Sequence, residues 1–220
     1  MKQALILFIV VIANIVVSLQ LSLLLLLQPS WIKYEYTKNN FPVDIFELPT
    51  NERFEFAKKT LIFISPWNLA NTSEPMDIQD KSLYTQKEIN HLVDVRTLLQ
   101  RFLIVSVIVT TALIGIFISK RKDFSTLAKI FNQSGLVTIG IIFFLSLGIT
   151  FLWEELFETF HRLFFPTGTW QYYETDMLIR LFPPEFWFDS AIALVGLVVA
   201  IQVLIILTTR LLLANDSLKG

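Results

Sequence analysis

The chain has 220 residues, 54% of them hydrophobic, and its mean hydropathy is +0.59. This composition is more apolar than that of soluble domains and predicts an integral membrane protein. The formal net charge of −1 argues against a nucleic-acid partner, and the absence of cysteine excludes disulfides, thiol nucleophiles and cysteine-ligated zinc.

Four apolar runs are long enough to cross the hydrocarbon core of a bilayer as helices, at a rise of about 1.5 Å per residue. They extend over about 4–27, 98–119, 136–153 and 190–207. The first run is longer than the apolar region of a signal peptide, and no small-residue cleavage motif follows it, so we expect it to be retained. The sequence thus predicts an all-α integral membrane protein with four transmembrane helices.

Basic residues indicate the orientation of these helices. Between the second and third runs lie Lys120, Arg121, Lys122 and Lys129. Lys2 precedes the first run, and Arg210 follows the fourth. The positive-inside rule then predicts that both termini face the cytoplasm. We expect residues 28–97 and 154–189 to form a mainly helical extracellular cap on one membrane domain spanning 1–220.

The first outer segment carries two helix signals. After Pro49–Asn51, apolar residues recur at helical spacing from Phe54 to Ile64, which predicts an amphipathic helix. A polar stretch follows from Asn68 to Lys81. Thr85 and Glu88 then match a capping box, and the chain continues without Gly or Pro into the second membrane run.

The chain has only two histidines, His91 and His161. If the flanking helices are unbroken, His91 lies about 10 Å and His161 about 12 Å outside the apolar runs, on the same side of the membrane. Their reference pKa of about 6.5 makes them the most plausible acid and base in the sequence. This pattern favours a catalytic function.

Carboxylates accompany both histidines at helical spacing. Glu88 and Glu158 each precede a histidine by three residues, and Asp94 follows His91 by three. Asp94 or Glu158 could fix a histidine tautomer. Alternatively, Glu158 pairs with Arg162, and Asp94 is a solvated carboxylate.

The two E-x-x-H pairs are also half the ligand set of a carboxylate-bridged di-iron site. Because Glu88 already caps a helix, and no further acids stand at a diagnostic spacing, we expect neither a metal nor another cofactor. A metal-dependent membrane hydrolase or oxidase remains an alternative.

The second outer segment is rich in aromatic residues, with eleven between Phe157 and Phe188. A membrane-interface belt explains Trp187 and Phe188. The stretch from Phe157 to Tyr173 fits better a closed pocket for an acyl chain or a lipid headgroup, because it would otherwise expose a large apolar surface above the membrane.

A non-catalytic membrane scaffold is the second alternative. The four runs lack a charged residue near the middle of the bilayer, which argues against an ion pathway. Their polar residues Asn14, Gln20 and Gln202 are expected to form interhelical hydrogen bonds.

Two motifs carry a resemblance to a known family. One is EINHLVDVR over residues 88–96; the other begins with FHRLFF at 160–165 and passes Trp170 to LIRLFP at 178–183. With the four-helix, capped topology, they resemble the lipoprotein intramolecular transacylases of Gram-positive bacteria.

The resemblance implies an acyltransferase. The sn-2 acyl chain of a diacylglyceryl-modified N-terminal cysteine would move to that cysteine's α-amino group and leave a lyso-form lipoprotein. The partners would be this lipoprotein and membrane lipid. The enzyme would be a multi-pass protein of the bacterial cytoplasmic membrane, with its active site on the extracellular side.

The resemblance also implies roles for individual residues. His91 and His161 would be catalytic. The expected supporting residues are Asp94, Glu158, Trp170 and Asp176, and the expected substrate contacts are Arg96, Arg162, Arg180, Phe164 and Phe165.

Overall fold

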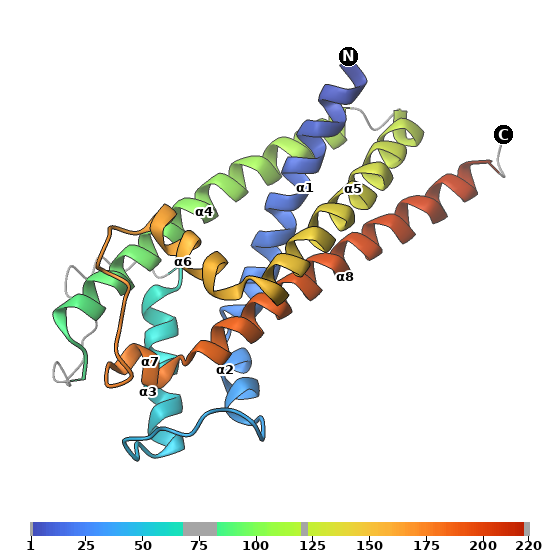
Figure 1. Ribbon diagram of the computed structural model, residues 1–220. Helices are drawn as coiled ribbons and strands as arrows, with labels where there is room; N and C mark the ends of the chain where they lie inside the picture. Colours follow the sequence, from blue (N-terminus) through green and yellow to red (C-terminus); the bar gives the residue numbers. More distant parts are fainter. Residues whose placement is uncertain (1, 68–82, 120–122, 218–220) are drawn as a thin grey trace. The chain divides into compact units, whose positions relative to one another are not determined.

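The computed structural model describes residues 2–67, 83–119 and 123–217. The polar stretch at 68–81 and the basic cluster at 120–122, on which two expectations rest, lie outside the described residues. The described part of the chain contains helices and no strand, which confirms the all-α class. In order along the chain (Figure 1), the helices are α1 Lys2–Leu26, α2 Pro29–Tyr36, α3 Thr50–Ile64, α4 Gln86–Ser119, α5 Phe124–Phe151, α6 Trp153–Phe164, α7 Met177–Leu181 and α8 Pro184–Ser217.

Four of these helices are long and apolar enough to cross a membrane. The candidate spans are Gln3–Leu26 of α1, Gln86–Ser119 of α4, Phe124–Phe151 of α5 and Pro184–Asp216 of α8. These helices extend beyond the apolar runs of the sequence. The reason is that a helix satisfies its backbone hydrogen bonds internally, so it can continue from hydrocarbon into the polar interface without interruption.

The chain divides into two compact units. We call the first the bundle unit (residues 1–23, 104–151 and 192–220) and the second the cap unit (24–103 and 152–191).

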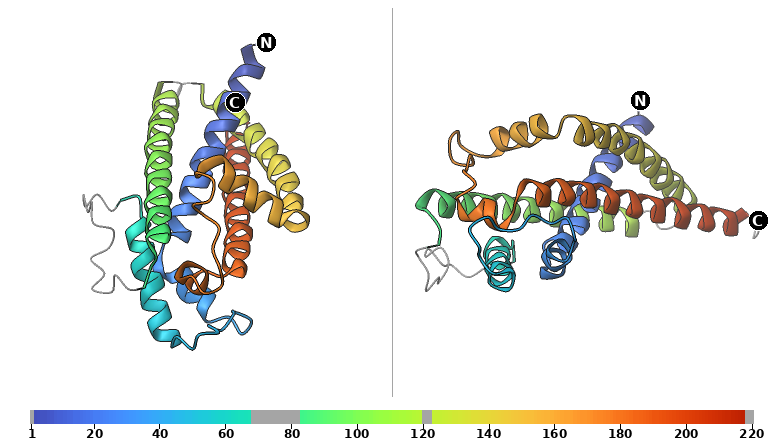
Figure 2. Two further views of the ribbon diagram at one scale, coloured as in Figure 1. Left: turned by 60° about the vertical axis from the view of Figure 1, so that its left-hand side comes forward. Right: turned by 60° about the horizontal axis from the view of Figure 1, so that its bottom comes forward.

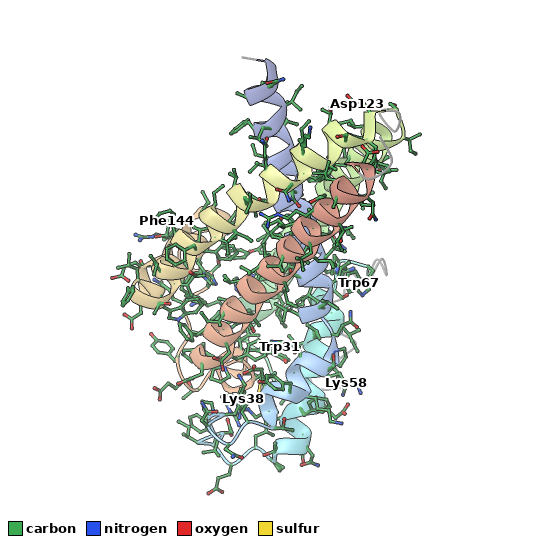
Figure 3. All side chains as sticks on the ribbon, turned by 90° about the vertical axis from the view of Figure 1, so that its right-hand side faces the viewer. Trp31, Lys38, Lys58, Trp67, Asp123 and Phe144 are labelled. Atoms are coloured by element: carbon green, nitrogen blue, oxygen red, sulfur yellow. The ribbon has the colours of Figure 1, made fainter. Side chains whose placement is uncertain are left out.

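A chain of polar side chains holds the bundle unit together. The Asn14 amide donates to Gln202 Oε1 at 2.7 Å and to Ser134 Oγ at 3.2 Å, and Gln202 Nε2 donates to Ser18 Oγ at 2.6 Å. All four residues are buried. The expectation of interhelical hydrogen bonds is therefore confirmed for Asn14 and Gln202, and Gln20 accepts a longer one from the Thr110 hydroxyl at 3.4 Å. Large apolar side chains face outward, as for Phe144, on the side of α5 away from α8 (Figure 3).

The cap unit has its own apolar core. Helices α2 and α3 lie side by side (Figure 2), and α3 also packs on α7. Ile32, Ala57 and Leu181, one from each of these helices, are completely buried there. α3 begins at Thr50, so the amphipathic helix expected from the sequence is confirmed.

Ion pairs fix the connections of the cap unit. Arg180 forms two hydrogen bonds with Asp44, at 2.8 and 2.9 Å, and this contact lowers the pKa of Asp44 to about 2. Lys38, just after the C-terminal end of α2 (Figure 3), binds both Glu35 and Asp189 at 2.7 Å. Charge pairing therefore ties α2 to the start of α8 and the loop before α3 to α7.

Candidate active site

The two histidines lie against each other in the cap unit. His91 is on the second turn of α4 and His161 on the last turn of α6. Their ring centroids are 6.0 Å apart, and the ring planes differ by 26°. The fold of the cap unit thus brings the two rings together laterally, in addition to the common height expected from the sequence.

Glu88 positions the segment that carries His91. Its Oε2 accepts hydrogen bonds from the backbone N–H of Thr85 at 2.7 Å and from the Thr85 hydroxyl at 2.9 Å, so the predicted capping box is confirmed. Its Oε1 accepts the backbone N–H of Leu178 in α7 at 2.8 Å. The carboxylate is almost fully buried. One side chain thus starts α4 and attaches it to α7. The sequence predicted the start of α4 but not its attachment to α7.

A backbone carbonyl fixes the tautomer of His161. Its Nδ1 lies 2.7 Å from the carbonyl oxygen of Phe157, one turn earlier in α6. Because a carbonyl oxygen only accepts, Nδ1 must carry the proton and donate it. In the neutral ring, Nε2 is then the basic nitrogen.

Burial keeps both imidazoles neutral. His91 lies in the polar N-terminal part of α4, outside its apolar run; it is 8% exposed, and burial, with smaller contributions from His161 and Lys87, lowers its pKa to about 4. Burial also lowers the pKa of His161, while the bond to Phe157 opposes this shift. At neutral pH, both rings are available to accept a proton.

Aromatic rings surround the pair. Phe165 contacts both histidines, with centroids 4.7 Å from His91 and 5.4 Å from His161. Trp170 lies 4.9 Å from His161, and Tyr172 lies 5.8 Å from His91. These residues belong to the aromatic stretch that the sequence analysis assigned to a binding pocket, and their rings limit the access of water to the histidines.

Two nitrogen atoms of the site are buried without a hydrogen-bond partner among the described residues. They are Nδ1 of His91 and Nε1 of Trp170. Buried polar atoms in proteins are nearly always paired, so these two nitrogens are candidates to bond a ligand or a water molecule. Both belong to rings beside His161, which makes this the place where a polar group of a ligand would be held.

The expected supporting carboxylates have other contacts. Glu158 pairs with Arg162 at 3.6 Å in an exposed ion pair, so Phe157, not Glu158, orients His161. Asp94 forms no hydrogen bond with His91, whose Nδ1 lacks a partner in the described part of the chain. Asp176 accepts the backbone N–H of Tyr173 at 2.7 Å and shapes the turn before α7.

The expected substrate contacts differ in their surroundings. Arg180 is engaged by Asp44 and Arg162 by Glu158, while the guanidinium of Arg96 lies 5.4 Å from the ring of Phe63. Phe165 is buried beside the histidines, whereas Phe164 is exposed. Phe165 contacts both histidine rings.

Sequence reasoning missed the contacts that hold the segment after α6 against α4. The ammonium of Lys87 donates to the carbonyl of Gln171 and lies 5.0 Å from the ring centroid of Tyr172. The Tyr172 hydroxyl donates to the carbonyl of Thr169 at 2.7 Å and weakly to that of Lys87 at 3.4 Å. No sequence signal marks these bonds, because their acceptors are backbone carbonyls.

The donor set for a metal ion is not assembled here. Within the described ranges, no group of three or more histidine, aspartate or glutamate side chains is placed to hold one. The Glu88 carboxylate, needed for one of the two E-x-x-H pairs, is used by Thr85 and Leu178. The residues of the site therefore fit acid–base chemistry better than metal ligation.

Comparisons with known proteins agree with this picture. A relative from Aquifex aeolicus (strain VF5), described as an uncharacterized protein, is 30% identical over 206 residues, which cover 93% of this chain and 92% of the relative. The fold is similar to the in meso structure of the membrane integral lipoprotein intramolecular transacylase Lit from Bacillus cereus. That match has a TM-score of 0.80 and 22% identity, and covers 99% of this chain and 98% of the other.

Structures of two variants of the Bacillus cereus protein also match. With one histidine replaced by arginine, the TM-score is 0.67 at 20% identity, covering 100% of this chain and 95% of the other. With alanine in its place, the TM-score is 0.66 at 19% identity, and the match covers 99% of this chain and 96% of the other. At these identities, the three structures establish the fold.

The family follows from the sequence itself. The model of the family "Lipoprotein intramolecular transacylase Lit" matches residues 4–187, which include all eleven candidate site residues. The chain is thus an integral membrane acyltransferase and belongs to the lipoprotein intramolecular transacylase family.

Proposed function

We propose that this enzyme moves the sn-2 acyl chain of a diacylglyceryl-cysteine lipoprotein to the α-amino group of the same cysteine and releases a lyso-form lipoprotein. The observation that carries the proposal is the pair of neutral histidines, His91 buried and His161 half-buried, with ring centroids 6.0 Å apart, in a member of this family. Amine and ester belong to one molecule, so orientation alone supplies much of the rate enhancement. No nucleophile from the protein is required.

His161 is assigned the role of proton acceptor. The amine nitrogen attacks the ester carbonyl carbon, and Nε2 of His161 takes the proton that the nitrogen loses. The support is the bond from Nδ1–H to Phe157, which leaves Nε2 as the basic atom. When the carbon–oxygen bond to the sn-2 glycerol position breaks, the same proton passes to the departing alkoxide. The reaction thus conserves atoms and protons.

His91 and Trp170 are assigned to the carbonyl oxygen of the ester. This oxygen becomes negative as the amine attacks, and N–H donors in a dry site stabilise that charge. Trp170 Nε1 can only donate, and His91 donates from Nδ1 when that atom carries the proton of the neutral ring. Both atoms are buried and lack partners in the described part of the cap unit.

Mass spectrometry of a synthetic diacylglyceryl lipopeptide tests the reaction. With the purified enzyme, the total mass of the lipopeptide should stay the same, while fragmentation shows one acyl chain moved to the amine. A lipopeptide acetylated at its α-amino group has no nucleophile and should not react. Release of free fatty acid from the acetylated peptide, as fast as turnover of the free-amine peptide, would instead make the protein a membrane lipase.

The proposed orientation places both termini in the cytoplasm and the histidine site on the outer side of the bacterial cytoplasmic membrane. Its support is the position of basic residues, including Lys129 of α5 and Arg210 of α8, at the ends of the candidate spans away from the cap segments. Single cysteines introduced at exposed cap positions such as Lys59 should react with an impermeant maleimide added to intact cells. Labelling only after lysis would mean that the cap faces the cytoplasm, opposite to the proposed orientation.

A further inference from the structure

Helix α6 carries an uncovered apolar stripe. Leu156, Phe160, Leu163 and Phe164 recur at helical spacing and are all exposed, Leu163 to 73%. The opposite side carries Glu154, Glu155, Glu158 and Arg162, which are also exposed. A helix that presents an apolar face and a charged face to its surroundings has the pattern of a helix lying in a membrane interface.

The cap unit covers only a narrow strip of α6. None of the twelve residues of this helix is buried, and only Trp153, Phe157 and His161, four residues apart, are half-buried. Phe157 and His161 also hold the hydrogen bond that fixes the imidazole. The apolar stripe lies next to this strip, so whatever covers it also determines the position of His161.

The stripe continues an apolar exterior that begins in a membrane-spanning helix. The candidate span of α5 ends at Phe151, and Leu152 alone separates it from α6. Phe151 and Leu152 are 77% and 52% exposed. The exposed apolar residues thus run along the chain from the lipid-facing side of α5 into α6 without a polar break before Glu154. This continuity favours lipid as the partner of the stripe.

We propose that α6 is an interfacial helix whose apolar stripe is seated among the acyl chains of the bilayer. Such helices lie about 5–10 Å deep, at the boundary between headgroups and acyl chains. The glycerol esters of lipids and of diacylglyceryl groups lie at that same boundary. Seating α6 there holds His161 at the depth of the ester that it acts on, and this consequence rests on the proposed function.

Spin labelling tests the placement without using activity. The chain has no cysteine, so single substitutions can be labelled directly. Leu163 and Glu154 are nine residues apart and, at about 3.6 residues per turn, lie on opposite sides of α6. In the full-length protein in lipid nanodiscs, the label on Leu163→Cys should collide with oxygen and be shielded from a water-soluble nickel chelate. The label on Glu154→Cys should show the reverse.

Two results would overturn the proposal. Equal access of the nickel chelate to both labels would mean that α6 stands clear of the bilayer. Shielding of the Leu163 label from both oxygen and nickel would mean that protein, such as a second copy of this chain, covers the stripe. Neither result depends on the reaction catalysed. The proposed function can therefore fail while the placement of α6 holds, and the placement can fail while the function holds.

A kinetic experiment tests the consequence for His161. Leu163→Glu places a charge in the apolar stripe and should lower the rate on a lipopeptide embedded in bilayers by about 10-fold or more. A short-chain lipopeptide dispersed in detergent does not lie at a fixed depth. On this substrate, the rate of the Leu163→Glu variant should stay within about threefold of that of the unsubstituted enzyme. Equal losses in both media would refute the depth argument. Glu154→Gln is the matched control on the opposite face.

Discussion

His161 is the residue whose chemistry the structure defines best. With Nδ1 bound to the carbonyl of Phe157, only Nε2 can accept a proton from the substrate amine. We therefore expect His161→Gln, which keeps a polar side chain but no base, to lower kcat by about 10²–10⁴-fold, the usual contribution of a general base. His91→Ala should lower it comparably. Thr159→Val, on an exposed part of the same helix, is the control. Most activity retained in His161→Gln would disprove the base assignment.

Trp170 provides a test of the donor assignment. Trp170→Phe keeps an aromatic ring against His161 but removes the Nε1–H. Loss of one donor to a developing oxyanion should reduce kcat by about 10- to 100-fold, with a smaller change in KM. Trp67→Phe, at an exposed tryptophan of the cap unit, should leave kcat unchanged. A change in KM alone would place Trp170 in ground-state binding instead.

The burial of His91 also makes stability depend on pH. The folded-state pKa of His91 is about 4, below its ordinary value of 6.5, so between these values the unfolded chain binds more protons than the folded chain. The free energy of unfolding should therefore be highest above pH 6.5 and fall as the pH drops from 6.5 to 4. Thermal unfolding in detergent across this range measures the effect. His91→Gln should show a shallower slope; an unchanged slope would place the protonation elsewhere.

At the scale of elements, the junction of α4 and α7 depends on Glu88. Replacing Glu88 with Ala leaves the backbone N–H of Leu178 and that of Thr85 without this acceptor. A buried unpaired donor costs about 1–3 kcal/mol, so we expect a clear fall in the melting temperature of the cap unit. Activity should fall as well, because His91 lies one turn after Glu88.

Gln86 provides the matched control for that substitution. Its amide donates to Asn90 at 2.9 Å on the exposed side of the same turn. Gln86→Ala should change the free energy of unfolding by less than about 0.5 kcal/mol, as for other surface substitutions. If Glu88→Ala and Gln86→Ala behaved alike, the carboxylate would not be the link between the two helices.

At the scale of the whole molecule, the bundle unit depends on buried polar contacts in a membrane protein that gains little from apolar burial between helices. Asn14→Leu would leave Gln202 without its 2.7 Å donor and should cost about 1–2 kcal/mol. Unfolding from detergent into denaturant measures this cost. Phe144→Leu, on the lipid-facing side of α5, should have little effect. Equal effects would mean that the polar chain contributes nothing specific.

The sequence by itself determined the features that depend on local pattern. Apolar length marked the four spanning helices, the spacing of Phe54, Ala57, Leu61 and Ile64 marked α3, and Thr85 with Glu88 marked the start of α4. The two histidine motifs marked the family. These signals are readable because helix geometry and hydrophobic thickness impose fixed spacings on the chain.

Only the tertiary structure decided which groups meet. The link from Glu88 to Leu178, the acceptor Phe157 that orients His161, and the engagement of Arg180 by Asp44 all involve backbone atoms or distant partners. A backbone carbonyl has no identity in the sequence, and a pair 136 residues apart has no periodicity. For that physical reason, the sequence could name the histidines, while the fold alone shows how they are held.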